Sequence, residues 1–251
     1  MHVIDQQTVT QILQKYPLDE QRLKVAVLSA KNTLQIIYDK VSRKYFESTK
    51  CGFFCDLLLS RCFSISGNSI ATLIRNYYFY PDYNFSQTAD SYFIIDASIG
   101  YESDIDIYFH DLVYNEDAKN TIASILDEMR KTYNRDSIDV FESNITIADN
   151  YTACTYSTKK IPEHTKMGWP VITDNAITMQ DGTQLIVHSF GPDFNKNFDF
   201  EHCKMKYNGK NLYASKLQLI CAAHKLILAA PDAQEYRLKK YSDRGFTVLT
   251  S

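Results

Sequence analysis

Residues 103–109, Ser-Asp-Ile-Asp-Ile-Tyr-Phe, decide the fold class, because polar and apolar side chains alternate along this stretch. Alternation of this kind is typical of a β-strand, in which successive side chains point to opposite faces. The two isoleucines and the phenylalanine then share one face, while Asp104 and Asp106 share the other. The sequence therefore predicts a strand with one face in a hydrophobic core and an acidic face turned toward a cleft.

Around this strand the hydrophobic pattern predicts further elements of both kinds. We expect helices at residues 8–15, 23–45, 51–61, 69–75, 116–133, 215–230 and 231–245. We expect strands at residues 62–66, 91–97, 175–179, 184–190 and 198–207, with Asp181-Gly182 forming the turn of a hairpin. Residues 76–90 are rich in Tyr and Asn and predict a loop, so that residues 76–102 hold an insertion.

These elements predict an α+β fold in which helices flank a mixed sheet. Hydrophobic residues make up 45% of the chain and charged residues 23%, which is ordinary for a globular protein, and the scarcity of Gly and Pro excludes disordered and collagen-like classes. We find no repeat and no linker, and expect a single domain over residues 1–251. Its parts are a helical N-terminal segment (1–61), a sheet region (62–213) and C-terminal helices (214–251).

Charge and targeting signals narrow the class of protein. The net charge of −3 argues against a long duplex DNA as partner, because proteins that hold many phosphates are usually basic. The six cysteines lack the spacing of a zinc site, and Met1–Asp5 does not begin a signal peptide. No apolar stretch is long enough to span a membrane. We therefore expect a cytoplasmic protein with no membrane partner.

Asp104 and Asp106 are the leading candidates for chemistry. Two positions apart on a strand, their Cα atoms lie roughly 6.5–7 Å apart on the same face. Two such carboxylates repel each other unless a cation lies between them, and oxygen ligands suit Mg²⁺ or Mn²⁺. Two ions of this kind can bind the attacking and leaving oxygens of a phosphoryl transfer. The alternative is an exposed strand face that happens to carry two acids.

Two further segments carry candidate site residues. Gly67-Asn68-Ser69 joins a predicted strand to a helix, where free N–H groups favour a phosphate, although capping by Asn68 or Ser69 is the alternative. Asp199 lies between two phenylalanines and needs a partner, which is either a shared metal or backbone donors. Glu201 shares its face and is an alternative third ligand.

The last predicted helix carries a basic face. Arg237, Tyr241 and Arg244 recur at helical spacing, with Lys240 beside them. This face predicts contacts to nucleotide phosphates or to an acceptor molecule. The alternative is that the basic residues are solvated and interact favourably with the helix dipole.

Together these features resemble the polymerase-beta-type nucleotidyltransferase superfamily. Its pattern is a Gly/Ser turn that opens a helix, an acidic pair alternating with apolar residues, and a third acid on a later strand. A narrower resemblance joins residues 62–246 to uncharacterised nucleotidyltransferase-like proteins of phages, giant viruses and some fungi, through residues 198–203 and 237–246. Two departures are the turn, which reads Gly-Asn-Ser, and its long distance from Asp104.

The resemblance implies a role for each candidate residue. Asp104 and Asp106 would bind both metals, and Asp199 would bind the catalytic metal and help to deprotonate the attacking hydroxyl. Gly67 and Ser69 would hold the phosphates of an NTP. The fold implied is a nucleotidyltransferase-type mixed sheet.

The first functional hypothesis is a metal-dependent transferase that moves an NMP from an NTP to an acceptor hydroxyl on RNA, a protein or a small molecule. A phage or viral protein of this kind would act in the host cytoplasm. The alternative is an inactive nucleotidyltransferase fold that binds a nucleotide or a host protein. An interaction protein that blocks a host defence factor, with the aromatic residues 77–85 as contact surface, is the third hypothesis.

Overall fold

The structure is a computed structural model that describes residues 6–43, 63–85, 93–110, 146–147, 171–172, 176–178, 183–190, 194–228 and 233–249. Its helices are α1 (Gln6–Lys15), α2 (Glu20–Val41), α4 (Asn68–Phe79), α7 (Lys216–Ala223) and α8 (Glu235–Ser242), with the 3-10 helices η5 (Phe194–Asn197) and η6 (Glu201–Cys203). Its strands are β1 (Phe63–Ser66), β2 (Ile94–Asp96), β3 (Tyr101–Ser103), β4 (Ile105–His110), β5 (Thr146–Ile147), β6 (Val171–Ile172), β7 (Ala176–Thr178), β8 (Thr183–Phe190), β9 (Lys206–Tyr207), β10 (Leu212–Tyr213), β11 (Leu226–Leu228) and β12 (Thr247–Leu249).

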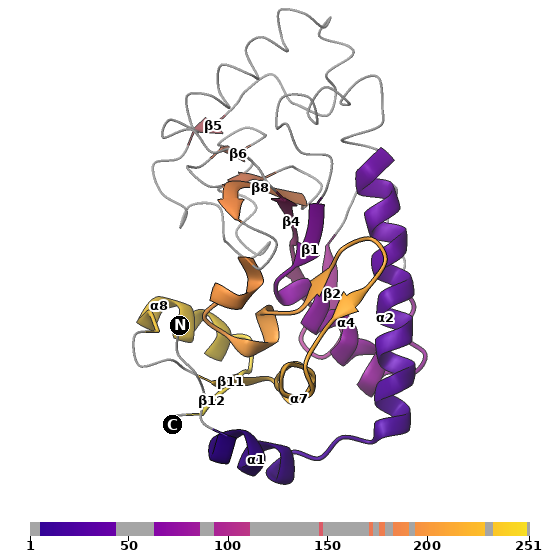
Figure 1. Cartoon of the computed structure of the whole chain (residues 1–251), viewed down its shortest axis with the longest axis vertical. Coiled ribbons are helices and arrows are strands. Elements are labelled where there is room, and N and C mark those ends of the chain that lie inside the picture. The colour runs from indigo at the N-terminus through magenta and orange to yellow at the C-terminus, as the bar shows by residue number, and fades with distance from the viewer. Residues whose placement is uncertain are drawn as a thin grey trace, which may run out of the picture.

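Strand β4 lies inside the largest sheet, whose strand order is β10-β9-β1-β4-β8-β7-β6-β5. It pairs antiparallel with β1 and parallel with β8, so the sheet is mixed, and helices pack beside it (Figure 1). Two smaller sheets join β2 to β3 and β11 to β12. The chain is therefore of the α+β class.

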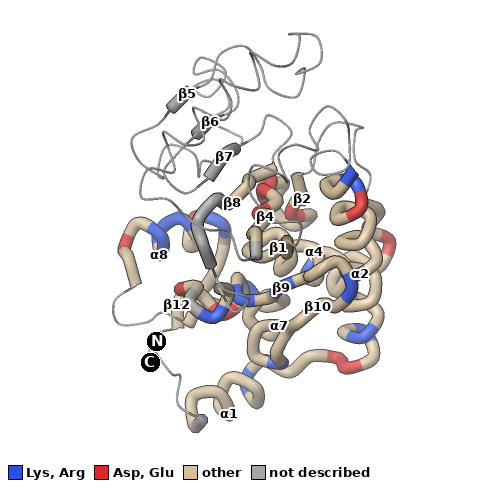
Figure 2. Tube along the Cα trace, turned by 45° about the horizontal axis from the view of Figure 1, so that its top comes forward, with Lys and Arg blue, Asp and Glu red and all other residues tan. Residues whose placement is uncertain are grey.

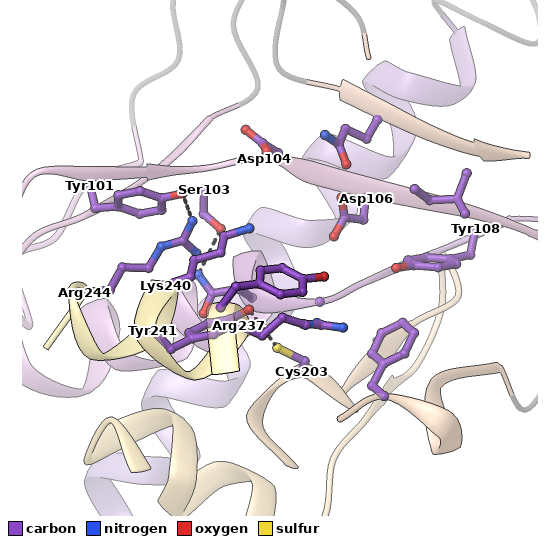
Figure 3. Close-up of a pocket in the computed structure, with 16 residues that line it drawn as sticks. Tyr101, Ser103, Asp104, Asp106, Tyr108, Cys203, Arg237, Lys240, Tyr241 and Arg244 are labelled. Atoms are coloured by element: carbon purple, nitrogen blue, oxygen red, sulfur yellow. Dashed lines mark hydrogen bonds between the residues drawn. The ribbon is translucent and has the colours of Figure 1, made fainter. Parts of the chain in front are cut away.

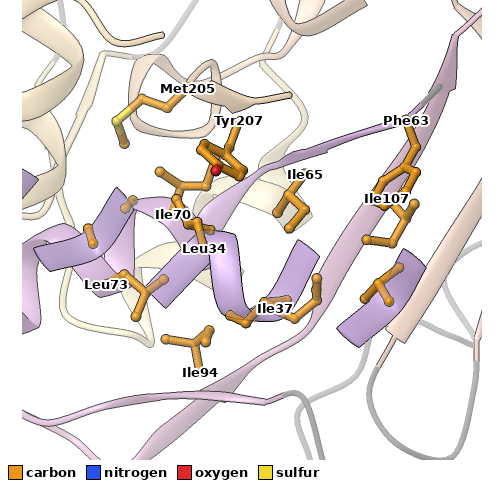
Figure 4. Close-up of a cluster of buried hydrophobic side chains, with 14 of the residues drawn as sticks. Leu34, Ile37, Phe63, Ile65, Ile70, Leu73, Ile94, Ile107, Met205 and Tyr207 are labelled. Atoms are coloured by element: carbon orange, nitrogen blue, oxygen red, sulfur yellow. The ribbon is translucent and has the colours of Figure 1, made fainter. Parts of the chain in front are cut away.

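The apolar face of β4 contributes to the main hydrophobic core. Ile105 and Ile107 are fully buried against side chains of α2, α4, β1 and β9, which Figure 4 shows meeting around Tyr207 and Leu34. Asp104, Asp106 and Tyr108 lie on the opposite face and line a cleft. The predicted division of residues 103–109 into an apolar and an acidic face is confirmed. Asp104 itself belongs to neither β3 nor β4 and lies at the junction between them.

Helix α4 is the central helix of the described structure. It begins directly after β1, with Gly67 as its N-cap, and nine of its twelve residues are buried. The helix extends to Phe79, so the loop predicted from residue 76 is wrong for its first four positions. Long-range contacts explain this extension: the Tyr78 hydroxyl accepts a 3.0 Å hydrogen bond from the Asp19 N–H, and the hydroxyls of Tyr77 and Thr33 lie 2.6 Å apart.

Most of the other predicted elements are confirmed where the structure describes them. Helices α1 and α2, strand β1 and the pairing of β7 with β8 agree with the prediction, and Ser215 caps α7 through a capping box. The predicted insertion contributes the hairpin of β2 and β3. In the aromatic segment 77–85, Tyr77 and Tyr83 pack against the core, while Phe79 and Tyr80 are exposed. Predicted helices at 51–61 and 116–133 lie outside the described residues.

Two differences concern the C-terminal third. Helix α7 ends at Ala223 because Lys225 adopts a left-handed backbone with φ of 51°, and Leu226–Leu228 then form a fully buried strand. A short buried strand and a buried helix have the same apolar pattern, which explains the wrong prediction of helix to residue 230. Residues 198–203 are a bend and η6, not a strand. In the described part of the chain, no helix has both the length and the apolar character to cross a membrane.

The core predicts a large difference between two leucines of α2. Leu34 is fully buried and Leu28 is 60% exposed, so the same truncation removes core contacts in one case only. Leu34→Ala is expected to lower the free energy of unfolding by about 2–5 kcal/mol, and Leu28→Ala to change it by less than about 0.5 kcal/mol. Urea denaturation of both variants measures the difference, and equal effects would contradict the described packing of α2.

Candidate functional site

A cleft of about 450 Å³ lies between the acidic face of β4 and helix α8 (Figure 3). Its volume is within the range of small-molecule sites. Its walls come from five parts of the chain: the start of α4, the β3–β4 segment, β8, the region of η6, and α8. The lining residues are Gly67, Asn68, Tyr101, Ser103, Asp104, Asp106, Tyr108, Gln184, Ile186, Phe198, Cys203, Tyr236, Arg237, Lys240, Tyr241 and Arg244.

Asp104 and Asp106 form the acidic wall. Burial raises the pKa of Asp104 to about 6. Burial and the neighbouring Asp104 charge raise the pKa of Asp106 to about 7, while Lys240 on α8 acts against this rise. Both carboxyls are therefore poorly stabilised as anions by the described residues alone, and a bound cation would favour their ionised forms.

Gly67 makes the close approach of α4 to this wall possible. A Cβ atom at this position would lie 2.6 Å from Asp106 Oδ2, and the backbone φ of 95° is one that other residues rarely adopt. The N–H of Gly67 donates to the Cys203 carbonyl at 3.3 Å. The absent side chain of Gly67 thus leaves room for the Asp106 carboxylate, and its N–H already has a partner other than a phosphate.

The two residues after Gly67 lie differently. Asn68 lines the cleft, and its Nδ2 donates to Ser103 Oγ at 3.1 Å and to Thr72 Oγ1 at 3.3 Å. Ser69 is fully buried and lies outside the cleft lining. Neither side chain caps α4, since Gly67 is the N-cap without a side-chain hydrogen bond. Of the predicted turn, only Gly67 and Asn68 reach the cleft.

Helix α8 forms a basic wall opposite the aspartates. Arg237, Lys240, Tyr241 and Arg244 all line the cleft, as their helical spacing predicted, and Figure 2 shows basic residues along α8 in blue. Burial lowers the pKa of Lys240 to about 8, assisted by Arg244 and opposed by the two aspartates. Tyr241 is buried, with its hydroxyl 3.2 Å from Cys203 Sγ. Arg237 and Lys240 of α8, and Arg244 in the turn that follows Ser242, thus face two carboxylates.

Asp199 is not brought to the aspartate pair. Its carboxylate forms a 2.7 Å ion pair with Arg237, and the residue lies outside the cleft lining. Glu201 pairs with Lys204 at 2.5 Å. On the strands that flank β4, Asp106 lies opposite Ser66 and Gln184, and neither residue is acidic. Among the described residues no cluster of three His, Cys, Asp or Glu side chains has the geometry of a metal site.

An aromatic wall was not predicted from the sequence. Tyr108 and Phe198 line the cleft with ring centroids 5.4 Å apart, and Phe194, outside the lining, stacks on Tyr108 at 4.3 Å. Tyr236, half exposed, adds a further ring to the lining. The one sequence signal for this wall was the place of Tyr108 on the same strand face as the aspartates. The support that η5 gives to Tyr108 and the contribution of Phe198 both depend on tertiary packing.

Comparison with known protein families places these residues in a wider context. The family model described as "Gabija anti-defense 2 family protein" matches residues 3–219 of the chain. The chain belongs to the Gabija anti-defense 2 family. The match includes Gly67, Asp104, Asp106 and Asp199, and it ends before α8 begins at Glu235. Neither the curated proteins nor the solved structures include a significant match.

The acidic wall of this Gabija anti-defense 2 protein has the donor chemistry that Mg²⁺ or Mn²⁺ requires. Mg²⁺ commonly binds one or two carboxylates and completes its octahedron with water and substrate phosphates. Asp104 and Asp106 supply two carboxylates, and Gln184 places an amide in the same cleft. The described residues therefore fit an ion that arrives with a phosphate ligand better than an ion held by protein ligands alone.

The raised pKa values predict how stability depends on pH. The folded pKa of Asp106, about 7, exceeds its reference value of 3.8, so this group favours the folded state below pH 4 and loses that contribution as pH rises to 7. Asp106→Asn, measured with EDTA present, is therefore expected to raise the free energy of unfolding of this protein more at pH 8 than at pH 5.

Urea denaturation at the two pH values measures this effect. The control is Asp82→Asn, at an exposed position of the turn after α4, which should change stability little at either pH. A gain from Asp106→Asn that is the same at pH 5 and pH 8 would contradict the placement of Asp106 in a poorly solvating wall.

Proposed function

We propose that this Gabija anti-defense 2 protein is a metal-dependent nucleotidyltransferase that counteracts Gabija defence, with a mixed sheet of the nucleotidyltransferase type. One observation carries the proposal: a single cleft holds Asp104 and Asp106 on one wall and three cations, from α8 and the turn after it, on the other. A triphosphate with its divalent cation has the complementary charges, because the cation suits the acids and the phosphate oxygens suit the cations. The family description supports the biological role, and a phage origin accords with it.

The chain's own residues suggest how a nucleotide would bind. Arg237, Lys240 and Arg244 would hold phosphate oxygens, and the rings of Tyr108 and Phe198 would hold the base by stacking. The cation bound by Asp104 and Asp106 would neutralise charge on the reacting phosphoryl group. An acceptor hydroxyl would form a bond to the α-phosphorus as the bond to pyrophosphate breaks. The acceptor, whether RNA, protein or small molecule, would approach from the open side of the cleft.

A second candidate function is binding of a nucleotide or a host protein without turnover. Two observations favour it. Asp199 forms an ion pair with Arg237 and does not join Asp104 and Asp106 as a third carboxylate. The family description names antagonism to a defence system and no reaction. In this case the cleft would sequester a nucleotide, or another surface would bind a defence protein. The two candidates differ in whether the aspartate pair is needed for product formation.

The transferase proposal predicts that label transfer depends on the aspartate pair. The purified protein is incubated with Mg²⁺ or Mn²⁺ and each labelled NTP, alone and with lysate of cells that carry a Gabija system. The wild type is expected to transfer label, and the Asp104→Ala/Asp106→Ala variant to fall to background, because the cation loses both carboxylates. Asp82→Ala, in an exposed turn outside the cleft, is the control and should retain activity.

The same variants separate catalysis from binding in cells. If catalysis counters the defence, the double variant should lose the ability to protect phage infection in Gabija-carrying bacteria, and Asp82→Ala should keep it. Protection that survives loss of both aspartates would reject the transferase role and favour partner binding. Metal-dependent NTP binding without any product would instead favour the nucleotide-sequestering function.

The aromatic wall predicts a separate effect on nucleotide affinity. Phe198→Ala removes a ring from the cleft while leaving the charged walls intact, and base–aromatic contacts contribute about 1–3 kcal/mol each. The variant is expected to weaken NTP binding by about tenfold and to leave binding of inorganic tripolyphosphate unchanged. Calorimetric titration of both ligands measures this, with Phe79→Ala at an exposed position of α4 as control. Equal losses for both ligands would contradict a base site at Phe198.

A further inference from the structure

Arg244, in the turn after α8, is held at two points, once by Tyr101 of the β2–β3 hairpin and once by Lys225. Its guanidinium carbon lies 3.8 Å from the centroid of the Tyr101 ring, and its Nη2 donates to the Tyr101 hydroxyl. At the other end of the residue, the Arg244 carbonyl accepts a 3.2 Å hydrogen bond from Lys225 Nζ. Lys225 in turn contacts the hairpin. Side chain and main chain of Arg244 are thus tied to one structural unit (Figure 3 shows the Tyr101 contact).

The ammonium of Lys225 has a defined partner for each of its three protons. It lies 3.1 Å from Asp96 Oδ2, 2.9 Å from Ser98 Oγ and 3.2 Å from the Arg244 carbonyl. The side chain is only 14% exposed, so water competes little for these contacts. The Lys225 carbonyl also accepts a 2.7 Å hydrogen bond from the Thr247 N–H, which fixes the main chain. Lys225 is therefore a rigid link rather than a solvated lysine.

Asp96 anchors this link to the centre of the fold. Its carboxylate is 4% exposed and forms a 2.5 Å ion pair with Arg75 of the central helix α4. Ser98 donates two further hydrogen bonds to Asp96, at 3.0 Å from the N–H and 2.6 Å from the hydroxyl. Across the hairpin, Asp96 pairs directly with Tyr101. Tyr101 contacts Arg244 directly, and Asp96, its partner across the hairpin, contacts Arg244 through Lys225.

We infer that Lys225, anchored by Asp96, is a positioning residue that holds Arg244 in the cleft for an anionic group of the ligand. This inference rests on the proposed nucleotide site, because Arg244 is one of its three phosphate contacts. Lys225 itself lies outside the cleft lining, so its effect on the ligand passes through Arg244. Loss of the Lys225 ammonium would release the Arg244 carbonyl in the turn after α8, and the guanidinium would then leave the Tyr101 ring.

The first measurement needs no ligand. The Nε–Hε resonance of Arg244, assigned by its absence in Arg244→Lys, should be displaced by the Tyr101 ring in the wild-type NMR spectrum. Lys225→Met keeps the length of the side chain, and is expected to move this resonance toward the position of a solvated arginine. Ser98→Ala, which removes one partner of Lys225 at an exposed position, should move it in the same direction by less. An unchanged resonance in both variants would overturn the inference.

The second measurement is a double-mutant cycle on the affinity for ATP with Mg²⁺. Arg244→Ala is expected to weaken binding by about tenfold, as for loss of a charge-assisted hydrogen bond. Lys225→Met should weaken it by about threefold to tenfold in the wild-type background and not at all in the Arg244→Ala background, because the two residues act in series. Lys239→Met, at an exposed lysine of α8 outside the cleft, is the matched control and should leave affinity unchanged.

The outcomes separate this inference from the proposed function. Additive losses in the cycle would mean that Lys225 acts independently of Arg244 and would overturn the positioning role. Thermal unfolding of each variant shows whether a loss of affinity reflects a damaged fold. If Lys225→Met damages the fold, the Arg244 resonance in Ser98→Ala tests the positioning role instead. A wild-type protein that binds no nucleotide would reject the proposed function, while the Arg244 resonance would still report whether Lys225 positions it.

Discussion

Strand β4 has an apolar core on one face and an acidic cleft on the other, and the arrangement of the described structure depends on the separation of the two. One face places Ile105 and Ile107 in the dry core, where apolar burial stabilises the fold. The other face presents two carboxylates whose ionisation burial opposes. The alternation of a strand satisfies both conditions at once. Helices α2 and α4 cover the first face, and the cleft with α8 lies over the second.

Helix α8, which packs on the core through Leu238 and Tyr241, brings positive charge close to the acidic wall. Two neighbouring acids in a partly enclosed cleft need positive charge nearby, and Lys240 and Arg244 supply it from the opposite wall. The same cations are then attracted to their acids when the cleft holds no ligand, and to phosphate when it holds one. Arg237 is already balanced by Asp199. A nucleotide with its metal ion would therefore meet charge of the opposite sign on both walls.

Local pattern predicted the parts of the site that depend on local structure. The sequence predicted the alternation around Asp104 and Asp106, the Gly67 turn and the basic face of α8. Each of these features depends on residues within a few positions of one another. The sequence did not predict the surroundings of Asp199. Its flanking phenylalanines look like a strand, but Phe200 packs in a core cluster with Tyr241 and Phe246, and the chain bends there.

The contacts that shape the cleft beyond these elements join residues far apart in the sequence. The stacking of Tyr108 on Phe194 and the extension of α4 through Tyr77 and Tyr78 arise from tertiary packing, which overrides local propensity. Short apolar runs such as Leu226–Leu228 carry no period that separates helix from strand. The family match ends before α8, so even recognition of the family does not cover the basic wall.

The contact between Tyr101 and Arg244 has a consequence for the order in which the cleft forms during protein synthesis. These residues are 143 positions apart, so at about 5–20 residues per second the ribosome adds Arg244 roughly 7 to 30 s after Tyr101. During that interval Asp104 and Asp106 have been added to the chain without their basic counterpart. Any ligand that needs both walls must wait for the later segment to dock. The core around β4 also depends on later segments, because Leu185 and Tyr207 belong to it. The complete cleft can therefore form only after the chain has been made as far as Arg244.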